Sequence, residues 1–249
     1  MGASVRSADR TLAIFEAFEA AGSQMQLGDI AAVCEMPLST CHALVQTLIK
    51  RGYLYSMGRR KELYPTVKLL RLAQNIATHD PFLSRISDIL TGLSQDSGET
   101  VTVGKRQGDA VLYISAFDGT HSIRYAARAG EYRPLHSTAL GRALLGELSG
   151  EVLDAWIGTQ TFKKVTPQTI TGRARLISEI EDGRARGYFI SSGEQTNDLT
   201  SVAVAIRHHA EPLAISLTGP THRMTPLIEN HGRRLLKVKK MIGELSELV

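Results

Sequence analysis

Cysteine, tryptophan and long apolar runs are scarce in this chain of 249 residues, which has 2 cysteines and 1 tryptophan. Cys34 and Cys41 lie close together, and with His42 they do not make the four-ligand spacing of a zinc site. We therefore expect no disulfide and no metal, and interpret both cysteines as small core residues. No run of about 18 apolar residues exists and the start lacks a signal-peptide pattern. These absences predict a cytoplasmic protein without a membrane span.

The signature motifs of common enzymes are also missing. His136-Ser137 and the stretch from Gly141 to Gly146 come closest to a nucleophile or a phosphate-binding loop. No G-x-S-x-G, G-x-G-x-x-G or Walker Lys-Ser/Thr pattern accompanies them. We therefore expect no catalytic residues, no cofactor and no enzymatic activity.

Length and composition predict two domains, because 249 residues with 43% hydrophobic content exceed one small module. The helical pattern of residues 66–78 breaks at His79-Asp80-Pro81, which places a linker there. We predict a first domain over 1–65, a linker helix over 66–81 and a second domain over 82–249. Residues 1–79 hold 9 Lys and Arg against 6 Asp and Glu, an excess too small to argue for nucleic acid by itself.

Residues 26–55 predict two short helices joined by a turn at Met36-Pro37. Apolar residues fall on one face of each helix, so the pair can share a small core. The second helix should start near Leu38, with Ser39 or Thr40 satisfying free donors of its first turn. Its outer face holds few charges and no carboxylate, and consists of Ser39, Thr40, His42, Ala43 and Gln46. Any helical hairpin shows such a pattern, so the flanking sequence must decide.

The flanking sequence favours a winged helix-turn-helix. Tyr53-Leu54-Tyr55 and Leu63-Tyr64 predict a β-hairpin whose tip contains Arg59 and Arg60. Cations at such a tip are often merely solvated, but beside a helix-turn-helix they can contact phosphate or the minor groove. Apolar residues at helical spacing between Ser7 and Ala20 predict a third helix, from which Arg10 could reach phosphates. This arrangement suits double-stranded DNA.

The remaining residues alternate strands and helices. Residues 100–103, 110–116 and 122–127 predict an antiparallel meander, followed by a helix that Ser137 or Thr138 caps. The free N–H groups of that helix start could bind an anion, although an ordinary capped helix would look the same. Further elements are a helix over 171–187, strands at 188–190, 201–206 and 213–219, and a terminal helix from Thr225. On the last strand, Ser216 and Thr218 alternate with apolar Ile215 and Leu217.

Five segments in this order resemble the IclR family of bacterial transcriptional regulators. They are SVRSADRTLAIFEAF, MPLSTCHALVQTLIKRGYL, PLHSTALGRALL, RARGYFIS and AISLTGPTHRMT. The resemblance implies an α+β chain: an N-terminal winged helix-turn-helix and a C-terminal GAF-like α/β effector-binding domain with an antiparallel sheet. It also implies a homodimer or homotetramer on a palindromic DNA operator, with a small organic effector.

The resemblance also implies effector-binding positions. Backbone N–H groups of Ala139 and Leu140 match the family's loop, beside Ser137 and Thr138, and Ser216 with Thr218 match its polar strand. Ser191 stands where relatives that bind keto acids have an acidic residue, and Ser201 where they have a cysteine. These exchanges remove a charge and a thiol. We therefore expect an organic acid with its own hydroxyl or carboxylate, such as an aromatic acid.

The chain is thus predicted to be a ligand-responsive DNA-binding regulator, with repression the favoured sense. The family often has Lys and Arg where this chain has Leu38 and Ala43, so specificity should depend on Ser39, Thr40, His42 and Gln46. Two alternatives remain open. One is a winged-helix module for protein interaction, and the other is a small-molecule-binding protein without sequence-specific DNA binding.

Overall fold

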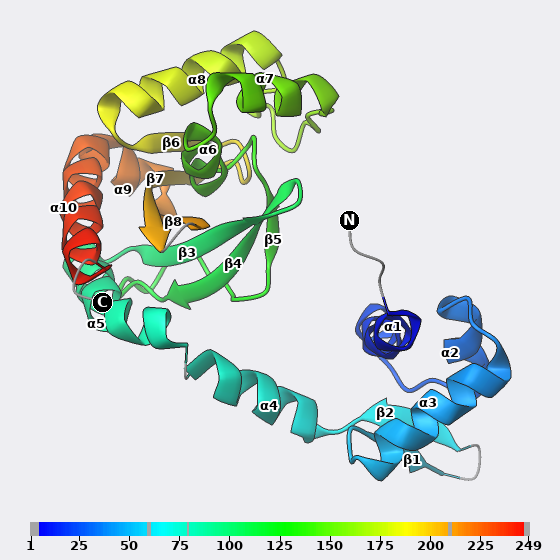
Figure 1. The fold of residues 1–249 in the computed structure, drawn as a ribbon. Coiled ribbons are helices and arrows are strands. Elements are labelled where there is room, and N and C mark those ends of the chain that lie inside the picture. The colour runs from blue at the N-terminus through cyan, green and yellow to red at the C-terminus, as the bar shows by residue number, and fades with distance from the viewer. Residues whose placement is uncertain (1–4, 59–60, 79, 209–210, 247–249) are drawn as a thin grey trace. The chain divides into compact units, whose positions relative to one another are not determined.

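The computed structural model describes residues 5–58, 61–78, 80–208 and 211–246 (Figure 1). The chain divides into two compact units, Met1–Asp80 and Pro81–Val249. Within the described residues, no helix is both long and apolar enough to cross a membrane.

The first unit contains a winged helix-turn-helix, as predicted, followed by a helix within the residues that we predicted as a linker. Its elements are α1 (Arg6–Ala21), α2 (Leu27–Val33), α3 (Leu38–Lys50), β1 (Leu54–Met57), β2 (Glu62–Pro65) and α4 (Val67–Thr78). One core joins Ile14 of α1, Ile30 of α2 and Val45 of α3 to Leu54 and Leu63 of the antiparallel hairpin. Cys41 is buried in the same core and Cys34 packs against it, so both serve as small packing residues.

The turn between α2 and α3 is tight. Glu35 has φ 47°, a left-handed conformation that non-glycine residues seldom adopt. Helix α3 starts at Leu38 as predicted, but its expected cap by Ser39 or Thr40 is wrong. Pro37 is the N-cap residue and no side chain caps the helix. Ser39 and Thr40 already lie inside the first turn, and a capping side chain must come from the non-helical residue before it.

The second unit is built on a six-stranded antiparallel sheet in the order β5-β4-β3-β8-β7-β6. Its strands are β3 (Thr100–Gln107), β4 (Ala110–Phe117), β5 (Tyr132–Pro134), β6 (Phe189–Ser192), β7 (Leu199–His208) and β8 (Glu211–Pro220). Its helices are α5 (Pro81–Ser97), α6 (Ala139–Gly146), α7 (Gly150–Thr159), α8 (Arg173–Arg186), α9 (Thr221–Met224) and α10 (Ile228–Ser246), with a 3₁₀ turn at Thr225–Leu227.

Three local differences separate this unit from the prediction. Residues 122–127 form no strand: most of these side chains are exposed, and the Tyr125 carbonyl accepts a bond from the Thr100 side chain. The third strand of the meander is instead β5, paired with the start of β4. Helix α7 was not anticipated, and α10 begins at Ile228 after the 3₁₀ turn that contains Pro226.

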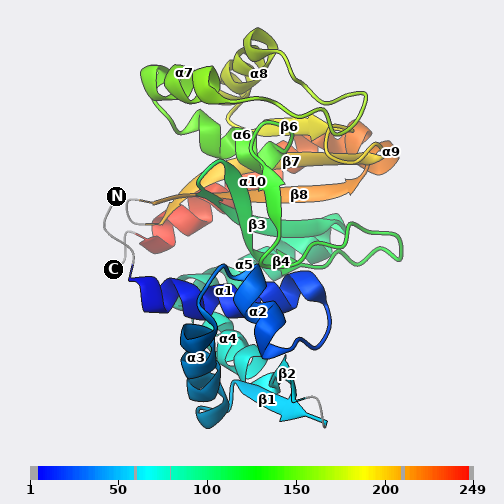
Figure 2. The same cartoon turned by 90° about the vertical axis from the view of Figure 1, so that its right-hand side faces the viewer.

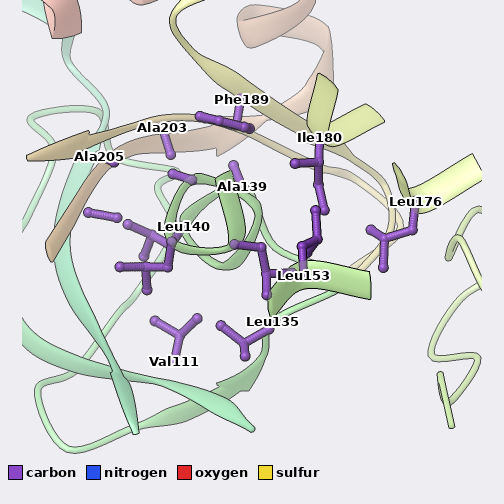
Figure 3. Packing of buried hydrophobic residues seen from close by; sticks show 14 of the residues in the cluster. Val111, Leu135, Ala139, Leu140, Leu153, Leu176, Ile180, Phe189, Ala203 and Ala205 are labelled. Atoms are coloured by element: carbon purple, nitrogen blue, oxygen red, sulfur yellow. The ribbon is translucent and has the colours of Figure 1, made fainter. Parts of the chain in front are cut away.

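Helices cover both faces of the sheet. Aliphatic side chains such as Val202, Val204 and Ile215 pack against α5 and α10. The alternate residues Ala203, Ala205 and Ala214 face α6, and α7 and α8 pack outside it (Figures 1 and 2). Figure 3 shows this second cluster, in which Leu135, Leu140 and Val111 meet Leu153 of α7 and Leu176 and Ile180 of α8. The end of this face next to the start of α6 is not filled by the cluster.

Candidate functional site

A pocket lies at the start of α6, and all eight predicted effector-binding residues line it. The loop before α6 and its first turn supply Ser137, Thr138, Ala139 and Leu140, and the strands supply Ser191, Ser201, Ser216 and Thr218. Residues from β6, β7 and β8 therefore meet a helix start that lies far from them in the sequence. Including the part open to solvent, the empty volume is about 410 Å³.

The start of α6 leaves backbone donors in the pocket wall. Thr138 is the N-cap residue: its hydroxyl accepts the Gly141 N–H at 3.1 Å and donates to the Pro134 carbonyl at 2.9 Å. The N–H groups of Ala139 and Leu140 lie in the first turn of α6. The helix has no carbonyl group four residues before them that could accept a hydrogen bond. Gly141 permits this packing, since a Cβ there would lie 2.1 Å from the Leu135 carbonyl oxygen. The unpaired donors and the helix dipole together favour an anionic group.

The side chains around the pocket are uncharged, and their hydroxyls hydrogen-bond to one another. Ser201 and Thr218 are 2.8 Å apart, and Ser216 lies 3.1 Å from Thr102 on β3. The Ser137 hydroxyl donates to Gln195 at 2.8 Å, while Ser191 donates to the Ser137 carbonyl at 2.9 Å. The lining itself therefore carries no formal charge, and its positive potential comes from the helix start and from groups behind the wall.

A buried ion pair stands behind the pocket wall. Arg142 of α6 is 1% exposed and binds the Glu194 carboxylate at 2.5 Å. The guanidinium also donates to the carbonyls of His136 and Ile190, at 3.2 and 2.7 Å, and Glu194 accepts the Ile170 N–H at 3.2 Å. Such dense pairing offsets the cost of removing both charges from water. The pair thereby fixes the segment whose next residue, Gln195, holds Ser137.

His136 and Ser137 do not form a nucleophile and base pair. The His136 ring is bonded through Nε2 to the Lys163 carbonyl at 3.1 Å, while the Ser137 hydroxyl is bonded to Gln195. Burial is the main cause that lowers the pKa of His136, and nearby Arg142 lowers it further. The imidazole is therefore neutral, and because a carbonyl only accepts, Nε2 carries its proton. Its role here is to anchor the loop that precedes α6.

Sequence reasoning missed part of the lining: Tyr113, Tyr125, Gln195, Thr196 and Leu199. Tyr113 lies two residues after Val111 on β4 and therefore on the same face, and that period could have assigned it to the α6 face. The other missed residues lie in irregular segments or at the very start of β7, where no periodicity exists.

The outer face of α3 is available for contact with a partner. Ser39, His42, Ala43 and Gln46 are exposed, and Thr40 is half-buried. Helix α3 contains no acidic residue, so this face would not repel an anionic duplex. Arg10 lies half-buried on α1. Arg59 and Arg60 fall outside the described residues, so the wing tip stays a prediction from sequence.

Comparisons with known proteins agree on one family. Residues 74–242 match the family model for the C-terminal domain of the bacterial transcriptional regulator IclR, and residues 7–57 match the IclR helix-turn-helix domain. The HTH-type transcriptional regulator BhcR of Paracoccus denitrificans is 30% identical over 223 residues, or 89% of this chain and 80% of that protein.

Solved structures share the fold. An IclR transcriptional regulator from Alicyclobacillus acidocaldarius superposes with a TM-score of 0.82 at 20% identity, over 98% of this chain and 100% of that one. An IclR homologue from Microbacterium hydrocarbonoxydans, complexed with 4-hydroxybenzoate, gives a TM-score of 0.77 at 20% identity, over 96% and 99%. The chain belongs to the IclR family of bacterial transcriptional regulators, and is thus a member of a regulator family rather than an enzyme.

Proposed function

We propose that this chain is a repressor whose binding to a palindromic operator changes when a small organic acid occupies the pocket at the start of α6. The observation that carries the proposal is the pocket itself, where free helix N–H groups meet a neutral, hydroxyl-rich lining. The carboxylate would bind the N–H groups of Ala139 and Leu140. The rest of the ligand would lie among hydroxyls that can donate or accept.

An aromatic acid suits this lining better than a small keto acid. Ser191 and Ser201 offer neutral groups, and the keto-acid-binding relatives place an acid and a thiol at these positions. The Microbacterium homologue, complexed with 4-hydroxybenzoate, makes this acid a sensible first probe for the same fold. Calorimetry should give tighter binding of hydroxybenzoates than of pyruvate or glyoxylate. The reverse order would overturn the assignment of the ligand class.

On DNA, α3 would lie in the major groove. The wing, which includes Arg59 and Arg60, would contact the phosphate backbone or the minor groove. Ser39, Thr40, His42 and Gln46 would then contact base edges or nearby phosphates, Ala43 would pack at the interface, and Arg10 would contact phosphate. Selection from a random duplex pool should enrich a palindrome. Salt-dependent binding without sequence preference would instead favour one of the alternatives, a protein-interaction module or a ligand-binding protein without an operator.

Gln46 offers a direct test of base contact. Replacing Gln46 by Ala should reduce discrimination at one base pair of each half-site by about 1–3 kcal/mol, because a specific side-chain contact is lost. Affinities for the selected operator and its single-base variants measure this. Gln24→Ala is the control, because Gln24 is an exposed glutamine that lies outside α3. Its side chain donates a hydrogen bond to Glu62. Full discrimination by the Gln46 variant would contradict the assignment.

A palindromic operator calls for a symmetric oligomer, and we propose a homodimer or homotetramer. Helix α4 supports this, because it exposes Val67, Leu70 and Ile76 by 57–67%. An apolar helix face of this kind is commonly covered by a partner. Sedimentation analysis of the full chain should give a dimer or tetramer, and a Leu70→Glu substitution should shift it toward the monomer. A wild-type monomer at micromolar concentration would contradict the proposal.

A further inference from the structure

Two tyrosines outside the predicted set form one side of the pocket. Tyr113 of β4 is 5% exposed, and Tyr125 of the following irregular segment is half-buried. Backbone bonds hold both in place. The Tyr113 N–H donates to the Glu131 carbonyl at 2.9 Å, and the Tyr113 carbonyl accepts from the Gly130 N–H at 2.8 Å. The Thr100 hydroxyl donates to the Tyr125 carbonyl. These bonds hold the backbone of both residues in place beside the pocket.

A cation lies behind the tyrosines. The hydroxyls of Tyr113 and Tyr125 interact with each other, and the Arg133 guanidinium interacts with the Tyr125 hydroxyl. Arg133 also lies 5.8 Å from the centre of the Tyr113 ring and pairs with Glu131 at 2.7 Å. These contacts thus form a series that ends at the pocket and runs through Glu131, Arg133, Tyr125 and Tyr113.

The number of hydrogen-bonding protons on the two phenols and Arg133 favours donation into the pocket. A guanidinium has donors only, so its interaction with the Tyr125 hydroxyl does not use the proton of that hydroxyl. The two phenols hold two O–H protons, and a hydrogen bond between them would use only one, whichever ring donates. Burial is the main cause that raises the pKa of Tyr113 far above its usual value, so this phenol keeps its proton at neutral pH. One O–H is left over, and the neighbouring cation makes it a stronger donor.

We propose that the Tyr113–Tyr125 pair selects effectors that carry a second hydrogen-bond acceptor away from the carboxylate. This inference rests on the proposed effector pocket. The acceptor would be a phenol, keto or second carboxylate oxygen. The Ser and Thr pairs elsewhere in the pocket can rotate to donate or accept. The arginine-backed tyrosines instead add a directional requirement at the β4 side of the site, separate from the amides of Ala139 and Leu140.

The test compares acids that differ by one acceptor, using the full chain and calorimetry. One series is benzoate with 3- and 4-hydroxybenzoate, and the other is pentanoate with 4-oxopentanoate. In the wild type, the best acceptor-bearing acid should bind about tenfold or more tightly than its plain partner. Tyr113→Phe or Tyr125→Phe should remove most of this preference while leaving the affinity for the plain acid within about threefold. These variants keep the ring volume and thus the shape of the pocket.

Tyr132→Phe is the matched control, because Tyr132 is 53% exposed on β5 and does not line the pocket. Its preference should equal that of the wild type. If acids bind but neither pocket Phe variant changes the preference, the inference is wrong and the proposed pocket stands. If no acid of either series binds the wild type, the proposed function fails for these acids and the inference fails with it.

Discussion

The two faces of the six-stranded sheet are both buried, yet they have different chemistry. Toward α5 and α10, side chains such as Val202, Val204 and Ile215 make an aliphatic core. Toward α6, the same strands present alanines and hydroxyls, and the buried Arg142–Glu194 pair joins α6 to the segment after β6. An aliphatic core needs only apolar side chains of suitable volume. The α6 face, in contrast, depends on specific partners, and the candidate pocket lies on that face.

Small residues explain why α6 can approach the sheet so closely. Gly104, Ala214 and Ala205 are register partners on the adjacent strands β3, β8 and β7. A Cβ on Gly104 would lie 2.7 Å from Val111 and 3.4 Å from Leu140, so no larger side chain fits there. The close approach carries the start of α6 to the hydroxyl-bearing ends of the strands. Packing on this face therefore sets the geometry of the pocket.

The largest expected effect comes from breaking the buried ion pair. Arg142→Met should lower the free energy of unfolding of the second unit by about 3–5 kcal/mol, because Glu194 would remain buried and unpaired. Urea unfolding followed by fluorescence of Trp156 reports on this unit alone, since the chain has 1 tryptophan. Arg207→Met is the control, because the Arg207–Glu147 pair is 66% and 23% exposed and its loss should cost about 0–1 kcal/mol. Equal losses would contradict the distinction between the faces.

An intermediate effect should separate two neighbours on β8. Ala214→Val adds volume on the α6 face and should cost about 1–3 kcal/mol through overpacking. It should also weaken acid binding, since α6 would shift. Ile215→Val on the opposite face should cost about 0.5–1.5 kcal/mol and leave acid binding unchanged. Trp156 fluorescence and calorimetry measure both quantities. Unchanged acid binding by the Ala214 variant would show that α6 packing does not control the pocket.

The smallest expected effect comes from a buried polar side chain on α10, the helix that covers the aliphatic face. His231 of α10 is 2% exposed, and neither ring nitrogen has a hydrogen-bond partner among residues 5–58, 61–78, 80–208 and 211–246. Burial is the main cause that lowers its pKa below the usual 6.5; Arg234 lowers it further and Glu99 opposes the shift.

The folded state therefore resists protonation of His231. As pH falls below 6.5 the unfolded chain takes up a proton first, and stability is lost until the lower folded pKa is reached. His231→Leu should remove this loss, so its stability advantage over the wild type should grow from pH 7.5 to pH 5. Paired urea titrations at each pH measure the difference. A constant difference would show that His231 does not titrate on unfolding.

Local patterns in the sequence were enough for most of the helices and strands and for the order of the domains, but not for α7 or β5. Alternation along β7 and β8, helical periodicity in α3 and α5, and the Thr138 cap are properties of short segments. They fix which residues face a core. The strand expected at 122–127 failed because β-like composition does not supply a neighbouring strand to pair with.

Only the tertiary structure could bring the wall of the pocket together. The partners Arg142 and Glu194, Ser137 and Gln195, and Ser201 and Thr218 come from different elements, so no local period encodes them. The identities of the residues set which groups are available, as hydroxyls, amides and one buried pair of charges. Their distances, and the tyrosines beside them, follow from how closely α6 packs on small residues, a property of the whole sheet.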